Sequence, residues 1–273
     1  MAIGITMSGT GLGAFFLPPA VEFLISNYGW RAGYRGIGLG AMLISLPIVI
    51  ALFREKTERT TAEETSKTVE KTAVWGVTRA QAMRTGRFWI LGAVLFVTVI
   101  VIAGFLSNFE RIMTEEGFER SSIATIAAVM GLTVIAGRIL VGALVDRFWA
   151  PGVAAWFFVL PTLGLLILIN TEVTFAMGLV IAVLVGLAAG AELDLLAYLT
   201  SKYFGAAHYP AIFGAIIAFF TVGAGIAPPI FGAVAQAYQG YTVILSISVA
   251  LLLISILLFL ALGRYPATSA TDD

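Results

Sequence analysis

The chain has 273 residues, of which 59% are hydrophobic and only 12% charged, and its formal net charge is zero. Its mean hydropathy of +0.98 lies far outside the range of soluble globular proteins and indicates an integral membrane protein. The balanced charge, without a basic or acidic tail, argues against a nucleic-acid partner, and the absence of cysteine excludes disulfides and thiolate metal sites.

Eight apolar segments are long enough to be candidate membrane spans, because a spanning helix needs about 20 apolar residues. Runs that are apolar on every side, such as "YTVILSISVALLLISILLFLAL", do not alternate as the strands of a membrane β-barrel do. We therefore predict an all-α integral membrane protein with eight transmembrane helices in a lipid bilayer. The predicted spans are 2–26, 33–53, 88–109, 122–144, 152–170, 174–197, 210–235 and 242–263.

One long polar segment, residues 54–87, separates the second and third predicted spans and carries eight of the sixteen Lys and Arg residues. Eleven basic residues then lie on one side of the membrane and four on the other. The positive-inside rule places this linker and both chain ends, including the tail 264–273, in the cytoplasm of a multi-pass cell-membrane protein. The end of the linker, "VWGVTRAQAMRTGRFW", mixes aromatic and basic residues and predicts a short amphipathic helix on the inner membrane surface.

An internal repeat relates the first two predicted spans to the last two. A shift of 210 positions superposes Gly13 on Gly223 and the pair Pro18-Pro19 on the pair Pro228-Pro229. Repeats of this kind are typical of transporter folds. Residues 88–263 would then be a complete six-helix half, and residues 1–53 the last two helices of the other half. We expect four further spans before residue 1, with Met1 an internal methionine; otherwise a dimer or a separate chain would complete the bundle.

Several motifs resemble those of the major facilitator superfamily. The stretch "GRILVGALVDR", residues 137–147, is similar to the family's signature between the second and third helices of each half. The stretch "GTGLGAFFLPP" resembles the glycine-proline motif of its fifth helix. The runs "LISNYGWRAGYRGIG" and "AMRTGRFW" resemble its monocarboxylate porter and oxalate/formate antiporter branch. The resemblance implies a carrier that moves a small organic anion by alternating access.

Arg138 is the candidate substrate-binding residue. It lies in an apolar run about two turns before the predicted end of its helix. A guanidinium stays charged in proteins, and placing it at mid-membrane costs at least about 2.5 kcal/mol, so it is expected to face a water-filled route or a partner. Its planar fork fits a carboxylate. The resemblance implies that Arg138 binds the substrate carboxylate; the alternative is that it pairs with a neighbouring helix and only holds the bundle together.

Two departures from the resembled branch bear on the substrate. The monocarboxylate porters have an aspartate one turn before this arginine, where the chain has Val134, and the antiporter has a lysine in its eleventh helix, near the place of Phe220. A monocarboxylate is therefore favoured over a dianion, and a coupled proton stays an open possibility. The sequence offers no nucleophile-base pair, phosphate loop or paired carboxylates, so we predict neither an enzyme nor a cofactor or metal.

Four charged residues are predicted to form a cytoplasmic latch. Asp146 and Arg147 follow the fourth span, and Glu192 and Asp194 lie near the predicted end of the sixth. Asp146 would meet the N-terminus of a neighbouring helix, and Arg147 would meet one of the two acids. Because Glu192 and Asp194 are two residues apart, they cannot share one helical face. The alternatives are an ordinary polar loop and, for the acids, a proton-coupling carboxylate.

Glycine and proline clusters in the first and seventh spans are predicted to serve helix packing and bending. Small residues allow helices to approach closely, and proline kinks a helix. Packing alone is the simpler interpretation, although a bend would suit a rocking carrier. A non-transporting membrane protein, or an inactive fragment with a structural role, is the competing function, and the oligomeric state is left open. The positions are Gly9, Gly13, Pro18, Pro19, Gly223, Gly225, Pro228 and Pro229.

Overall fold

The computed structural model describes residues 20, 23–25, 27–52 and 75–265, which fall into two compact units. The smaller unit contains α2 (Trp30–Leu52), a helix of 23 residues that begins three residues before the predicted second span. Its length of about 34 Å is sufficient to cross a bilayer. Most of the predicted first span lies outside the described residues, so the count of eight spans stays a prediction.

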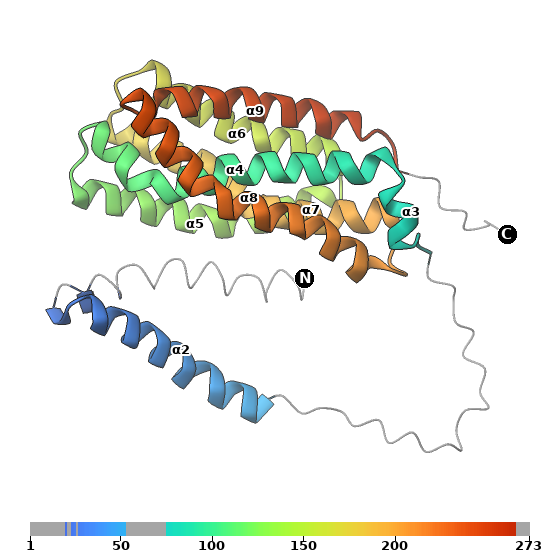
Figure 1. Cartoon of the computed structure of the whole chain (residues 1–273), viewed down its shortest axis with the longest axis horizontal. Helices are drawn as coiled ribbons and strands as arrows, with labels where there is room; N and C mark the ends of the chain where they lie inside the picture. Colours follow the sequence, from blue (N-terminus) through green and yellow to red (C-terminus); the bar gives the residue numbers. More distant parts are fainter. Residues whose placement is uncertain (1–19, 21–22, 26, 53–74, 266–273) are drawn as a thin grey trace. The chain divides into compact units, whose positions relative to one another are not determined.

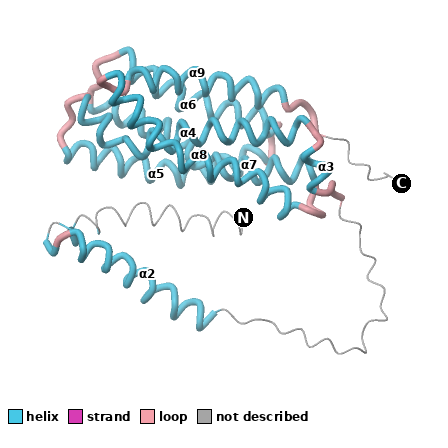
Figure 2. Tube along the Cα trace, viewed as in Figure 1, coloured by secondary structure: helices cyan, strands magenta, loops and turns pink. Residues whose placement is uncertain are grey.

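The larger unit, residues 75–265, is built almost entirely from helices (Figure 2). Six of its helices are long and apolar enough to cross a membrane, and each coincides with one of the last six predicted spans. The largest difference is at the end of α7, which extends seven residues beyond the predicted boundary. In chain order, the helices of this described segment are α3 (Arg79–Met83), α4 (Gly86–Glu115), α5 (Arg120–Val145), α6 (Ala150–Asn170), α7 (Phe175–Phe204), α8 (Tyr209–Tyr238) and α9 (Thr242–Ala261).

The six long helices pack side by side into one bundle (Figure 1). The most extensive pairings are α5 with α7 and α4 with α8, and α6 lies between α7 and α9. Phenylalanines fill much of the interior, and the rings of Phe158 and Phe259 stack at 5.4 Å between α6 and α9. Because the interior is mostly apolar, the few polar side chains inside it are informative about function.

Helices α5 and α8 leave much apolar surface uncovered within the larger unit. Only 22% of the most apolar stretch of each is buried, against 56% for α4, α6 and α7. Large side chains such as Leu132 and Ile139 of α5 and Val222 of α8 are at least half exposed. Apolar surface of this extent is stable only against lipid or further protein, as expected for part of a membrane bundle.

The predicted amphipathic helix at the end of the linker is shorter in the structure. Only Arg79–Met83 is helical, and it starts with a capping box in which Thr78 and Gln81 bond each other's backbone. The residues before it are held differently, because Gly76 forms an isolated β-bridge with Gly205. The backbone pairing with the end of α7 therefore replaces the first turns of the expected helix.

The segment after α9 is fastened to the same end of the bundle. The Tyr203 hydroxyl donates a 2.6 Å hydrogen bond to the carbonyl of Gly263, and Arg87 Nη2 donates to the carbonyl of Arg264 at 3.2 Å. The Tyr265 hydroxyl accepts the backbone N–H of Ala150, the first residue of α6. These bonds join the start of α4, the start of α6 and the end of α7 through one short segment.

Candidate functional site

The contact between α5 and α7 is built on glycines, and it sets the register of the polar residues nearby. A Cβ at Gly190 of α7 would overlap the backbone carbonyl of Val134, and a Cβ at Gly137 of α5 would overlap that of Leu187. A Cβ at Gly186, one turn before Gly190, would overlap the side chain of Thr133 and lie 2.7 Å from the backbone carbonyl oxygen of Met130. Since backbone meets backbone at these points, the two helices approach as closely as small residues permit.

This close packing places Arg138 beside Asp194. Arg138 follows Gly137 on α5, and Asp194 lies one turn after Gly190 on α7. Both side chains are half-buried, and the guanidinium interacts electrostatically with the Asp194 carboxylate. Arg138 is seven residues, or about 10 Å, from the end of its helix. The structure therefore brings an acid to this arginine from a neighbouring helix.

Glu192 lies on a different side of α7 from Asp194. Its side chain is only 5% exposed and faces α4, where the hydroxyl of the completely buried Thr98 lies 2.7 Å from Glu192 Oε1. Residues two apart on a helix project about 200° from each other, which explains the separation of the two acids. Thr98, a single hydroxyl in an apolar run, carried no signal in the sequence that would have linked it to Glu192.

The structure does not bring Arg147 to the two acids proposed as its latch partners. Within the described chain, Glu192 is bonded to Thr98 and Asp194 lies beside Arg138, and neither forms an ion pair with Arg147. The reason is the length of α7, which continues to Phe204 and leaves Asp194 about 15 Å from its end. The two acids thus lie well inside the helix and not at its end.

Asp146 is the C-cap residue of α5, and the residue before it is bonded to α7. The Tyr198 hydroxyl donates a 2.9 Å hydrogen bond to the carbonyl of Val145, the residue before Asp146. Lys202 lies 5.4 Å from the Tyr198 ring. Tyr198 therefore attaches the end of α5 to α7, a contact that the sequence did not indicate.

The glycine and proline positions in α8 divide into two kinds. A Cβ at Gly223 would meet Val99 and the Phe96 carbonyl, so this glycine allows α8 to approach α4. A Cβ added at Gly225 would have no atom of the described chain within 4 Å. Both prolines lie inside the continuous helix α8. The corresponding positions in the first predicted span, Gly9, Gly13, Pro18 and Pro19, lie outside the described residues.

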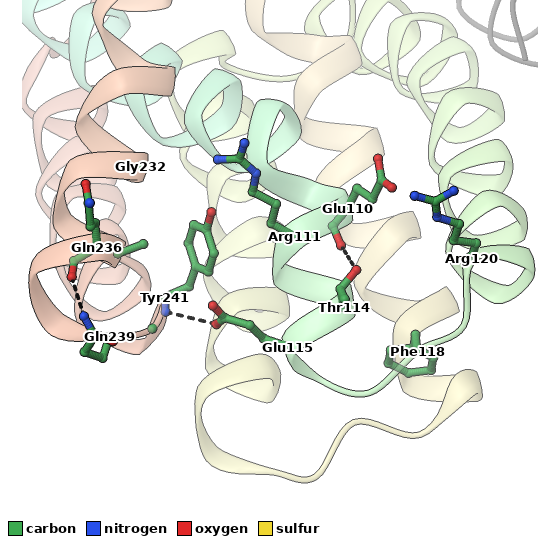
Figure 3. A pocket seen from close by; sticks show the side chains of 12 residues that line it. Glu110, Arg111, Thr114, Glu115, Phe118, Arg120, Gly232, Gln236, Gln239 and Tyr241 are labelled. Carbon is green, nitrogen blue, oxygen red and sulfur yellow. Dashed lines mark hydrogen bonds between the residues drawn. The ribbon is translucent and has the colours of Figure 1, made fainter. Parts of the chain in front are cut away.

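A polar pocket of about 790 Å³ opens at the end of the bundle that lies away from Asp146 and Tyr198. It is formed by the ends of α4 and α8 and the starts of α5 and α9. Figure 3 shows Arg111, Glu115 and Tyr241 around it; the Tyr241 backbone N–H donates to Glu115 Oε2 at 3.4 Å. The Tyr241 hydroxyl donates to Asn108 Oδ1 at 3.1 Å. No group of three or more potential metal ligands occurs among the described residues.

Glu116, just beyond α4, gives this end of the bundle a pH dependence. Burial and the neighbouring Glu115 charge raise the pKa of Glu116 above its usual 4.5. The folded state therefore binds this proton more tightly, and stability falls as the pH rises above 4.5 through the raised value. We expect Glu116→Gln to gain thermal stability over the wild-type chain with increasing pH, measured by melting in detergent. The same trend in Glu119→Gln, a nearby exposed carboxyl, would contradict a local origin.

Comparison with known proteins places this arrangement in a family. The profile of the Major Facilitator Superfamily matches residues 1–215 and, in a second overlapping match, residues 112–273. Monocarboxylate transporter 12-B of Danio rerio is 27% identical over 294 aligned residues, covering 97% of this chain and 61% of the relative. Monocarboxylate transporter 12 of Rattus norvegicus is 28% identical over 170 residues, covering 54% of this chain and 35% of the relative. The human protein of that name is 39% identical over 67 residues, covering 23% and 13%.

The chain spans about three fifths of the length of the fish relative. The relatives are named as transporters and not as enzymes, and the resemblance seen in the sequence motifs is confirmed. Several apolar helices of spanning length agree with a multi-pass membrane protein. Since the family profile matches the full length of the sequence, the chain belongs to the Major Facilitator Superfamily.

Proposed function

We propose that the chain takes part in secondary transport of a small organic anion, a monocarboxylate, across the cell membrane by alternating access. The proposal is supported by the family and by the names of the relatives, which are monocarboxylate transporters. The observation that carries it is the position of Arg138, half-buried about two turns before the end of α5 and beside Asp194. In this proposal Arg138 binds the substrate carboxylate through its planar fork.

The charge pattern around Arg138 favours a monoanion. In the described long helices, no other Lys or Arg lies further than five residues from a helix end. A single guanidinium offers one bidentate site for one carboxylate. Asp194 would neutralise Arg138 in the absence of substrate, and the substrate carboxylate would compete with it. A dianion would require a second cation that these helices do not supply at this depth.

The proposed topology has eight spans, with residues 1–53 and 88–263 in the membrane and the linker 54–87 and the tail 264–273 in the cytoplasm. Its support is the uneven charge at the two ends of the larger unit. One end holds six basic residues and one acidic residue, Asp146, and the other holds two basic and five acidic residues. The first set is Arg79, Arg84, Arg87, Arg147, Lys202 and Arg264; the second is Arg111, Arg120, Glu110, Glu115, Glu116, Glu119 and Glu172.

We propose that Asp146 and Arg147 act as a latch in a conformation other than the one seen here. Asp146 and Arg147 are both exposed in this structure. We assign to Asp146 and Arg147 contacts that form when the cytoplasmic side closes. Pro228 and Pro229 interrupt the hydrogen bonding of α8 from within and would let it bend during that change.

Uptake by proteoliposomes that contain the full chain tests the proposal. Labelled lactate, pyruvate, formate and oxalate would be supplied outside, with unlabelled substrate inside to drive exchange. We expect saturable uptake of at least one of the three monocarboxylates, and much weaker uptake of oxalate because of the single guanidinium. Uptake at the level of empty liposomes for all four would favour the alternative of a non-transporting membrane protein.

A further inference from the structure

Glu192 and Thr98 are two polar side chains enclosed by apolar helices. Glu192 is 5% exposed and Thr98 is completely buried, and their oxygens lie 2.7 Å apart across the contact between α7 and α4. An ionised carboxylate at such a place is costly unless a cation or several donors stabilise it. The protonation of Glu192 therefore depends on what faces it from the neighbouring helices.

The helices that pack against α7 provide almost no charge near Glu192. Helix α6 has no titratable side chain along its entire length, and those of α4 and α8 are confined to the helix ends. In the interior of α5 the only charged side chain is Arg138, which lies beside Asp194. The titratable groups on these helices are Arg87, Glu110, Arg111 and Glu115 of α4, Arg120 and Arg138 of α5, and Tyr209 and Tyr238 of α8; α7 itself adds Asp194, Tyr198, Lys202 and Tyr203.

The number of hydrogens at this site also favours a protonated acid. Thr98 Oγ1 lies within hydrogen-bonding distance of two acceptors, Glu192 Oε1 at 2.7 Å and the Leu95 carbonyl at 3.3 Å. A hydroxyl has only one hydrogen to donate. If Glu192 carries a proton, its own O–H donates to Thr98 Oγ1, and the Thr98 O–H donates onward to Leu95. A protonated acid thus satisfies both contacts, whereas beside an ionised acid the Thr98 hydroxyl can donate to only one of the two oxygens.

We propose that Glu192 is a proton-binding site in the six-helix unit, holding its proton in the conformation seen here through the chain from Glu192 to Thr98 to Leu95. Its part in transport rests on the proposed function: the proton would leave for water when the contact between α4 and α7 opens. That contact is much smaller than those of α5 with α7 and of α4 with α8, so it can open while the larger contacts stay intact. The site then couples one proton to one monoanion.

Infrared spectroscopy of the reconstituted full chain tests the proton site without any need for transport. At about pH 7 an ordinary glutamate, with a pKa of about 4.3, is ionised and lacks the C=O stretch of a carboxylic acid. We expect this stretch in the wild-type chain, its loss in Glu192→Gln, and its displacement to higher frequency in Thr98→Val. Thr98→Ser should keep the wild-type band. Absence of the band from the wild-type chain, or its loss in Asp194→Asn instead of Glu192→Gln, would overturn the proposal.

A transport measurement then tests the coupling. A pH difference of one unit can drive accumulation of a monoanion about tenfold if one proton accompanies it. We expect wild-type proteoliposomes to approach this ratio, and Glu192→Gln to retain measurable substrate exchange but reach a ratio of about one. Retained accumulation in Glu192→Gln would refute the coupling role. If the wild-type chain shows no transport while the infrared band is present, the transport proposal fails and the proton site stands.

Discussion

Replacement of Arg138 by alanine is expected to reduce monocarboxylate uptake to the level of empty liposomes. A hydrogen-bonded charged group contributes about 1.5–3 kcal/mol, so its loss should weaken substrate binding roughly 10- to 150-fold. No other Lys or Arg of the described long helices lies more than five residues from a helix end, so none can substitute for it. Arg138→Lys should retain part of the binding, because lysine keeps the charge but not the planar fork.

Matched variants separate substrate binding from a structural role. Arg111→Ala removes an arginine of the polar pocket at the opposite end, and it should leave exchange unchanged. If Arg138 only holds the bundle through Asp194, Arg138→Ala should lower the yield of folded protein, and the additional change Asp194→Asn should restore both yield and uptake. Folded Arg138→Ala protein with normal affinity for substrate would refute the substrate-binding role. Affinity is measured by equilibrium binding to purified protein, and folding by size-exclusion chromatography in detergent.

The positions of the long helices could be predicted from the sequence because their cause is local. A stretch of about 20 apolar residues must be helical in lipid, wherever its neighbours lie. The predicted span ends at residue 197, whereas the helix continues through "YLTSKYF", which contains the polar residues Ser201 and Lys202. It stays helical since Tyr198, Leu199 and Tyr203 pack against the rest of the bundle. With the earlier boundary, Glu192 and Asp194 lie near the predicted end of the helix, where Arg147 is a plausible partner. With the observed boundary they lie 12 and 10 residues before its end.

The candidate site could be predicted only as single residues. Arg138 was identifiable because one arginine in an apolar run has an evident energetic cost. Asp194 was identified as a possible partner of Arg147, but its pairing with Arg138 was not, because that pairing depends on the register between α5 and α7. Thr98 was missed for a similar reason, since its contact with Glu192 joins residues 94 positions apart. Long-range pairings of this kind follow from the packing of glycines and large side chains, which a single sequence does not specify.

The register between α5 and α7 can be tested directly through Gly190. Gly190→Ala adds one methyl group, which would overlap the backbone carbonyl of Val134. A backbone atom cannot move aside as a flexible side chain can, so we expect a loss of about 1–3 kcal/mol in unfolding free energy. Gly190→Leu should yield little folded protein. The displacement would also separate Asp194 from Arg138, so the surviving Gly190→Ala protein should bind substrate more weakly than the wild-type chain.

Gly131→Ala is the matched control, because it adds the same methyl group to the middle of α5. Within the described chain, a Cβ at Gly131 would meet no atom within 4 Å. Alanine is favoured over glycine inside a helix by about 0.5–1 kcal/mol, so this variant should be neutral or slightly stabilised. Thermal melting of both purified variants gives the comparison. Equal stability of Gly190→Ala and Gly131→Ala would mean that α7 can shift along α5 without cost, and the geometry that joins Arg138 to Asp194 would then not be fixed by these glycines.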